Sequence, residues 1–206
     1  MLPASARKCA PADLARELEA RLAAIPANQR LLVGISGIPG AGKSTLAQQL
    51  AVTLNARGHA VATVVGMDGW HYLRAQLDTF PDPVHAHARR GAAFTFDADA
   101  FVAFASALRA SEPNLYAPAF SHAEKDPVAD SIEVADARIV LVEGLYCNLS
   151  VEPWNRAAAL WDVRWLVVAT EDTARDRLIS RHVAAGITRT REEARERGAY
   201  HCLQPT

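Results

Sequence analysis

The segment GISGIPGAGKST, residues 34–45, constrains the fold more than any other part of the chain. Gly37, Gly42, Lys43 and Ser44 fit the spacing G-x-x-x-x-G-K-[ST]. Glycines at these places let backbone N–H groups turn inward around an anion, and a helix that starts near Lys43 adds its positive dipole end. An apolar run (31–36) precedes the segment and an amphipathic stretch (43–58) follows it. This context predicts a phosphate-binding loop and argues against a chance glycine-rich turn.

The residue types in this loop predict a nucleotide site that also binds Mg²⁺. Lys43 can reach the β- and γ-phosphates as a point charge, and the Ser44 hydroxyl can ligate the metal ion. The residues expected to contact the nucleotide are Gly37, Pro39, Gly40, Ala41, Gly42, Lys43, Ser44 and Thr45.

Apolar runs and amphipathic stretches alternate along the chain. Strands are expected at 31–36, 59–66, 137–144 and 163–169, and helices at about 14–25, 43–58, 97–110 and 171–186, with a basic helix to about 197. Apolar strands joined by helices predict an α/β fold, a parallel sheet with helices on both faces. We expect one domain over residues 1–206, with 1–29 as an N-terminal helical extension. The polar stretch from Asp68 to Thr95 is too irregular to assign.

Charge and composition narrow the classes of partner. A net charge of −1 over 206 residues does not favour a nucleic-acid or anionic-membrane surface. No apolar run approaches the roughly 20 residues of a membrane-spanning helix. Cys9, Cys147 and Cys202 lie far apart without a C-x-x-C pair, which argues against a disulfide framework or a thiolate zinc site. We expect no nucleic-acid or membrane partner and a cytoplasmic location; the oligomeric state is left open, a homodimer included.

Two acidic residues follow predicted strands at the edge where the phosphate loop lies. Glu143 ends an apolar run and is expected to hold Mg²⁺ directly or through water; the alternative is a carboxylate that faces solvent. Asp68 follows the second strand, so it can face the γ-phosphate from the acceptor side and take the proton of a hydroxyl. Its alternative is an Asx turn with Gly69. Because ligands bind beyond the carboxyl ends of parallel strands, we favour the functional interpretation of both acids.

Two other classes of site are disfavoured. His71, His85 and His87 suggest zinc, yet no cysteine is near and no helical two-histidine spacing with an acid accompanies them. A GTPase normally carries an Asn-Lys-x-Asp segment that reads guanine, and this sequence has none.

Four motifs in order resemble the phosphoribulokinase/uridine kinase family over roughly residues 30–195: GISGIPGAGKST, MDGWHY, YAPAFSHAEKDP and IVLVEGLY. Their spacing is also similar to that of bacterial-type pantothenate kinases. The resemblance implies transfer of the γ-phosphoryl group of ATP to a hydroxyl of a nucleoside-, sugar- or pantothenate-like molecule. It also implies a parallel sheet of about five strands and an arginine-bearing helical lid over residues 171–197.

The resemblance assigns roles to individual residues. Asp68 matches the base for the acceptor hydroxyl, and Arg177 and Arg181 match lid arginines that neutralise charge on the transferred phosphoryl group. With Lys43 these form the expected catalytic set. Tyr116, Phe120 and His122 match the substrate-facing segment, although core packing is an alternative for the two aromatic residues. Further residues expected at the acceptor pocket are His71 and Trp70, as its wall, and Arg89 and Arg90, which either hold polar groups of the substrate or face solvent.

The C-terminal end departs from the family pattern. Relatives usually continue past the lid helices to a further strand, whereas this chain ends in RERGAYHCLQPT. We therefore expect a C-terminus shortened relative to the family. The alternative function is a nucleotide-binding P-loop protein with impaired or no phosphotransfer.

Overall fold

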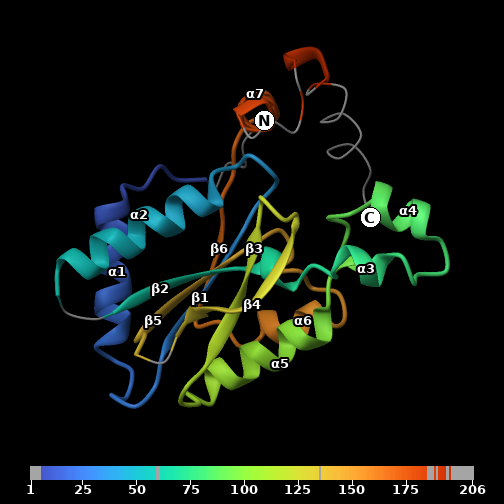
Figure 1. The fold of residues 1–206 in the computed structure, drawn as a ribbon. Coiled ribbons are helices and arrows are strands. Elements are labelled where there is room, and N and C mark those ends of the chain that lie inside the picture. The colour runs from blue at the N-terminus through green and yellow to red at the C-terminus, as the bar shows by residue number, and fades with distance from the viewer. Residues whose placement is uncertain are drawn as a thin grey trace.

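The central element of the fold is a parallel β-sheet (Figure 1). The computed structural model describes residues 6–58, 61–134, 136–184, 188, 190–193 and 195. Strands β1 (Leu31–Ser36), β2 (Ala62–Gly66), β5 (Ile139–Glu143) and β6 (Val163–Leu166) lie in the order β2-β5-β1-β6, and every pairing is parallel. The prediction of an α/β parallel sheet is confirmed. The sheet has four strands in the described part of the chain, where about five were expected.

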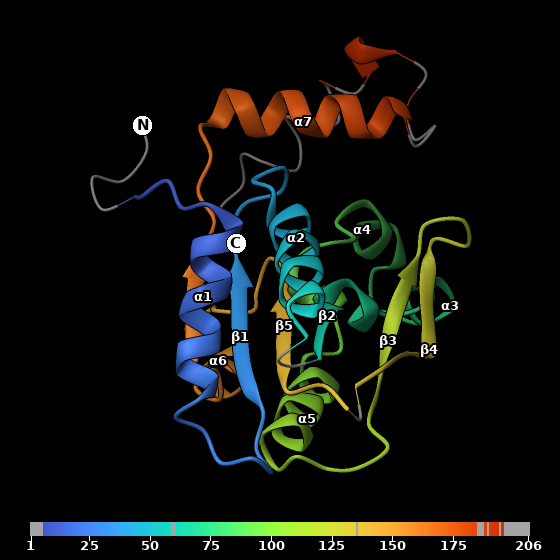
Figure 2. The same cartoon turned by 90° about the vertical axis from the view of Figure 1, so that its left-hand side faces the viewer.

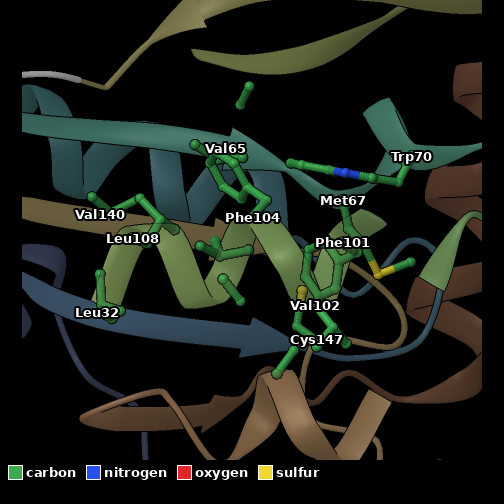
Figure 3. Close-up of a cluster of buried hydrophobic side chains, with 14 of the residues drawn as sticks. Leu32, Val65, Met67, Trp70, Phe101, Val102, Phe104, Leu108, Val140 and Cys147 are labelled. Atoms are coloured by element: carbon green, nitrogen blue, oxygen red, sulfur yellow. The ribbon is translucent and has the colours of Figure 1, made fainter. Parts of the chain in front are cut away.

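Helices cover both faces of the sheet, which explains the uninterrupted apolar runs of the central strands. Helices α1 (Pro11–Leu22) and α2 (Lys43–Ala56) lie on one face, and α5 (Ala98–Arg109) and α6 (Trp154–Ala158) on the other (Figure 1). Two clusters of buried apolar residues form the core, one on the α1–α2 face of the sheet and one on the α5–α6 face. Alternate residues of β1 point to the two faces: Leu31, Val33 and Ile35 belong to the first cluster and Leu32 to the second. Figure 3 shows part of this second cluster, in which α5 packs on the sheet.

The predicted N-terminal extension contributes to the core. Helix α1 buries Ala15 and Leu18 completely, in one cluster with residues of α2 and β1. Its first turn contains Pro11 and Asp13, both suited to a helix start. Helix α1 therefore packs as part of the same α/β body.

The unassigned stretch after β2 consists of short helical elements. They are the 3₁₀-helix η1 (Met67–Trp70), helices α3 (Arg74–Leu77) and α4 (Pro83–Ala88), and the 3₁₀-helix η2 (Ala93–Thr95). Asp82 begins α4 by accepting a hydrogen bond from the His85 N–H at 2.9 Å, and Pro83 follows at the first helical position. Such short elements carry no helical periodicity, so the sequence pattern alone does not reveal them.

A two-stranded antiparallel ribbon lies beside the sheet and was not expected from the sequence. It consists of β3 (Tyr116–Ser121) and β4 (Asp126–Glu133), with an irregularity between Ala117 and Ala119. The ribbon packs closely on η1, because a methyl group on Gly69 would lie 2.3 Å from the Pro118 carbonyl oxygen. The missing side chain of Gly69 therefore lets the ribbon approach the segment that carries Asp68.

Helix α7 (Glu171–Ala184) follows β6 and crosses above the upper ends of β1 and β5 (Figure 2). The predicted basic helix after it falls largely outside the described residues, which include only 188, 190–193 and 195 beyond α7. Within the described part of the chain, no helix is both long and apolar enough to cross a membrane.

Candidate functional site

The carboxyl ends of three strands bring the predicted site residues together. In the parallel register, Ile35 of β1 and Gly66 of β2 both pair with Glu143, the last residue of β5. The phosphate loop begins two residues after Ile35, and Asp68 lies two residues after Gly66. The loop, Asp68 and Glu143 are therefore at one edge of the sheet, as the strand-edge rule predicts.

The phosphate loop has the backbone shape that its glycines allow. Gly42 is the N-cap of α2 with φ 103°, and Gly40 has φ 78°, both in the left-handed region. No side chain caps α2, and its first turn contains no acidic residue. The first N–H groups and the positive dipole end of this helix thus remain suited to an anionic ligand.

The Lys43 ammonium is folded against its own loop. Its Nζ donates hydrogen bonds to the carbonyl oxygens of Gly37 at 2.9 Å and Ile38 at 3.3 Å. Burial lowers the pKa of Lys43, while the negative charges of Glu143 and Asp68 act to raise this pKa. The two acids therefore favour the charged lysine that phosphate binding needs.

Ser44 and Glu143 form the part of the site that fits a magnesium ion. The Ser44 Oγ donates a hydrogen bond to Glu143 Oε1 at 2.8 Å. Burial raises the pKa of the Glu143 carboxyl, the Ser44 hydrogen bond lowers it, and the charge of Asp68 raises it. A hydroxyl and a desolvated carboxylate are hard oxygen donors, and a cation between them and a phosphate would relieve the cost of burying this charge.

Asp68 lies in η1 with an exposed side chain. Its charge raises the pKa of both Lys43 and Glu143, which places the carboxylate within electrostatic reach of both groups. Among the described residues, no hydrogen bond to the Asp68 carboxylate is present, so the Asx turn with Gly69 is not formed. The carboxylate thus remains available to an external donor.

His71 lies directly beside Asp68. Its Nδ1 is 2.8 Å from the Asp68 backbone oxygen, and because a carbonyl only accepts, Nδ1 carries the proton. Burial lowers the pKa of His71, an effect that the charge of Asp68 opposes, so the ring favours its neutral form. In this tautomer Nε2 is an acceptor for a substrate hydroxyl.

Aromatic rings continue from His71 along the acceptor side. The His71 ring centroid lies 3.9 Å from that of Phe96 and 5.1 Å from that of Phe120, and His122 follows at 5.4 Å from Phe120. Arg90 places its guanidinium carbon 5.6 Å from the Phe120 ring centroid. Among the residues expected at the acceptor pocket, the structure therefore brings together His71, Phe120 and His122, with Arg90 beside them.

Arg90 connects the wall of rings formed by His71, Phe120 and His122 to the β3–β4 ribbon. Its guanidinium pairs with the Asp126 carboxylate at 2.6 Å and donates to the Tyr72 carbonyl oxygen at 2.8 Å. These partners lie in the segment after η1 and at the start of β4. Arg90 thus links the ring of Phe120 to the segment after η1; its expected role in holding polar groups of the substrate stays a prediction.

One predicted acceptor residue, Tyr116, lies away from these rings. Tyr116 is at the opposite end of β3 from Phe120, is 42% exposed, and contacts Glu133 through its hydroxyl at 3.4 Å. Burial raises the pKa of the Tyr146 hydroxyl, and the charge of Arg89, which ends α4, acts against that rise. Tyr116 therefore lies away from His71 and Phe120, and a role of Arg89 in acceptor binding stays a prediction.

Trp70 corrects an expectation about the pocket wall. Its ring is buried, 5.1 Å from the Phe101 ring centroid and 4.9 Å from that of Phe104 (Figure 3). The 3₁₀ turn that exposes Asp68 directs Trp70 into the core between sheet and α5. Its assignment to the pocket wall is wrong, because its indole belongs to the core.

Helix α7 lies directly on the phosphate loop. The Arg177 Nη1 donates to the carbonyl oxygens of Ala41 at 3.1 Å and Gly40 at 3.4 Å. A methyl group on Gly40 would lie 2.3 Å from the Ala174 carbonyl oxygen. Arg181, one turn further, acts on the site by charge and lowers the pKa of both Lys43 and Glu143. Both predicted lid arginines are therefore at the site: Arg177 contacts the loop directly, and Arg181 acts through its charge.

Asn148 is a supporting residue that sequence reasoning missed. Its Nδ2 donates to Gly34 O at 3.1 Å, Ser36 Oγ at 3.0 Å and Trp165 O at 3.0 Å. These bonds join β1, just before the phosphate loop, to β6, just before α7. A single loop asparagine carries no periodic pattern, so nothing in the sequence marks it.

The fold and these contacts define a P-loop nucleotide-binding protein of the α/β class. A phosphate loop joins β1 to α2, acids follow the neighbouring strands, and an arginine-bearing helix lies across the loop. Residues 4–69 match the model of the methylmalonyl Co-A mutase-associated GTPase MeaB, a match that covers the phosphate loop and less than half of the chain.

Comparison with known proteins gives the family. The chain is 42% identical over 172 residues to a candidate uridine kinase of Schizosaccharomyces pombe, C227.14, spanning 82% of this chain and 73% of that protein. It is 48% identical over 126 residues to the ATP-dependent kinase-like protein notR′ of Aspergillus versicolor, spanning 59% of this chain and 73% of that protein. The chain belongs to this family of uridine kinase-like P-loop kinases. Similarity to pantothenate kinases stays a prediction.

Solved structures agree with this assignment. A candidate fructose transport system kinase from Silicibacter sp. TM1040 has a TM-score of 0.80 and 31% identity, covering 94% of this chain and 89% of that chain. YFH7 from Saccharomyces cerevisiae also has a TM-score of 0.80, covering 91% of each chain, and at 22% identity it supports the fold alone.

Proposed function

We propose that this protein transfers the γ-phosphoryl group of ATP to a hydroxyl group of a small molecule, with Mg²⁺ as the metal ion. The observation that carries the proposal is the position of Asp68. Its exposed carboxylate has no hydrogen-bond partner among the described residues, and its charge acts on both Lys43 and Glu143. A free carboxylate on this side of a phosphate loop is suited to a hydroxyl acceptor.

The nucleotide would bind along the phosphate loop. Its phosphates would accept from the N–H groups at the start of α2, and Lys43 would exchange its contacts with Gly37 and Ile38 for phosphate oxygens. Ser44 and Glu143 would hold Mg²⁺, which when bound neutralises phosphate charge. The loop residues Pro39, Gly40, Ala41, Gly42 and Thr45 complete the proposed nucleotide contacts.

The transfer step then follows from the acceptor side. Asp68 would orient the acceptor hydroxyl and take its proton while the hydroxyl oxygen forms a bond to the γ-phosphorus. The bond from the γ-phosphorus to the bridging oxygen breaks, and ADP leaves with its electron pair. Arg181 would neutralise charge on the transferred group, because its charge already acts on Lys43 and Glu143.

The acceptor would bind against the wall of rings. His71, Phe120 and His122 offer flat apolar surface, and the acceptor Nε2 of His71 suits a second hydroxyl. A polyhydroxy ring, as in a nucleoside or a sugar, fits this chemistry. The names of two similar proteins, the candidate uridine kinase of Schizosaccharomyces pombe and the candidate fructose transport system kinase of Silicibacter sp. TM1040, support the same class of acceptor.

The test is an acceptor screen. The purified full chain is incubated with Mg²⁺-ATP and a panel of nucleosides, sugars, sugar phosphates and pantothenate, and ADP formation is measured. At least one acceptor should stimulate turnover, and Asp68→Asn should lower that turnover by about 10²- to 10⁴-fold with ATP affinity retained. ATP binding without turnover on any acceptor would contradict the kinase proposal. Equal rates in the two proteins would contradict the role of Asp68 alone.

A further inference from the structure

A groove of about 320 Å³ lies along the outer face of α2, next to the phosphate loop. Its lining residues are Ala41, Gly42, Thr45, Leu46, Gln49 and Arg177. The volume is within the range of small-ligand sites, about 300–1,000 Å³. One end of the groove is the loop itself, so a molecule whose phosphates bind the loop can extend into it.

The walls of the groove differ in chemistry along its length. Arg177 is held in place by the carbonyl oxygens of Ala41 and Gly40, and its planar guanidinium can stack on an aromatic ring. Leu46 adds apolar surface. Gln49 lies one helical turn beyond Thr45 on the same face of α2, about 10 Å along the helix from Gly42.

Gln49 is a polar side chain of this groove whose carboxamide has unused hydrogen-bonding capacity. Its backbone oxygen accepts from Thr53, but no hydrogen bond to its carboxamide is present among the described residues. A carboxamide offers one donor and one acceptor edge. Adenine presents a matching pair at N6 and N7, whereas guanine presents two acceptors at O6 and N7.

We propose that Gln49 contacts the nucleotide base and selects adenine over guanine. This inference rests on the proposed function, because it assumes that the triphosphate binds the loop. It adds a residue that determines base specificity and that lies outside the phosphate-loop motif.

The chain provides a matched control. Gln48 is the same residue type on the same helix, is also exposed, and does not line the groove. Binding of non-hydrolysable ATP and GTP analogues and of inorganic tripolyphosphate is measured by calorimetry on the full chain, for wild type, Gln49→Leu and Gln48→Leu. Leucine is a good helix former, so the exposed face of α2 should tolerate both substitutions.

Wild type should bind the ATP analogue more tightly than the GTP analogue. Gln49→Leu should weaken the ATP analogue by about tenfold without changing tripolyphosphate binding, and Gln48→Leu should change neither. An unchanged ATP affinity in Gln49→Leu would overturn the inference, as would an equal loss for tripolyphosphate. If wild type binds neither analogue nor tripolyphosphate, the proposed function itself fails; if it binds all three equally, only base selection by Gln49 fails.

A second variant at the same position tests whether the preference for adenine over guanine can be shifted toward guanine. Gln49→Glu keeps the length of the side chain but replaces its donor with a second acceptor oxygen. It should lower the preference for the ATP analogue over the GTP analogue. The reason is that a carboxylate can accept hydrogen bonds from the N–H groups of guanine. An unchanged preference in this variant would also count against contact between residue 49 and the base.

Discussion

The Ser44 hydroxyl donates to the Glu143 carboxylate at 2.8 Å and so joins the first turn of α2 to the end of β5. The two residues lie 99 positions apart in the chain, and the parallel pairing of β1 with β5 brings them together. A hydroxyl from the phosphate loop and a desolvated carboxylate thus lie next to each other. A cation bound to a phosphate would be expected at this position.

Glu143→Gln should weaken the binding of Mg²⁺ in the presence of ATP by about 10- to 100-fold. Glutamine keeps the shape of the side chain and removes the negative charge that the cation needs. Calorimetry with and without Mg²⁺ measures the effect, and nucleotide binding without metal should be retained. Glu133→Gln, on the exposed ribbon strand β4, is the control. Unchanged Mg²⁺ dependence in Glu143→Gln would exclude a role for this carboxylate in metal binding.

The pH dependence of the unfolding temperature should also show that Glu143 is a buried carboxyl with a raised pKa. Burial raises the pKa of this carboxyl above its ordinary value of 4.5, so the fold favours the protonated form. Without metal, ionised Glu143 therefore destabilises the fold as pH rises from the unfolded pKa through the higher folded pKa. Glu143→Gln should raise the thermal unfolding temperature relative to wild type at pH 7, with the difference shrinking below pH 4.5. A difference that grows on acidification would have the wrong sign.

The site residues that the sequence predicts are those whose signals are local. Lys43 and Ser44 belong to one short motif, and Glu143 and Asp68 each follow an apolar run. The parallel-sheet rule then brings these strand ends to one edge without any knowledge of side-chain contacts. The sheet itself was predictable for the same reason, since buried strands appear as apolar runs.

Features that depend on long-range packing could not be predicted. Strand β4 is mostly exposed and contains Pro127, so its pattern does not indicate a strand, and its partner β3 is interrupted by an irregularity. Trp70 follows Asp68 directly, yet a 3₁₀ turn directs it into the core. The spacing of Arg177 and Arg181 predicts a shared helix face, but only the packing of α7 on Gly40 determines which arginine contacts the loop.

The two lid arginines should therefore have separable effects. Arg177→Ala removes the contacts with the carbonyl oxygens of Gly40 and Ala41 and should mainly weaken nucleotide binding. Arg181→Ala removes a charge that acts on Lys43 and Glu143 and should mainly lower kcat, by about 10²- to 10³-fold. Steady-state kinetics with the acceptor found by screening distinguish KM for ATP from kcat.

Arg175 is the control for both lid variants. It lies on the same helix, and its ion pairs are with Glu171 and Asp172 of that helix, at 3.4 and 3.5 Å. Exposed pairs of this kind contribute little to stability. Arg175→Ala should leave both kinetic constants near wild type. The assignment of separate roles is contradicted if Arg177→Ala and Arg181→Ala change KM and kcat in the same proportion.

Gly69 should be intolerant of any side chain, because the ribbon backbone occupies the space. A methyl group there would meet the Pro118 carbonyl oxygen at 2.3 Å and would push β3 away from η1. Gly69→Ala should cost about 1–3 kcal/mol of unfolding free energy and should also lower acceptor-stimulated turnover, since Phe120 and Asp68 lie on the two displaced segments. Gly58→Ala is the matched comparison: its φ is 71°, and an added methyl group would meet no heavy atom of the described residues within 4 Å. It should lose about 1 kcal/mol through backbone strain alone and keep full activity. Urea unfolding and turnover, measured together, separate the two cases, and normal turnover in Gly69→Ala would show that the ribbon does not position the acceptor side.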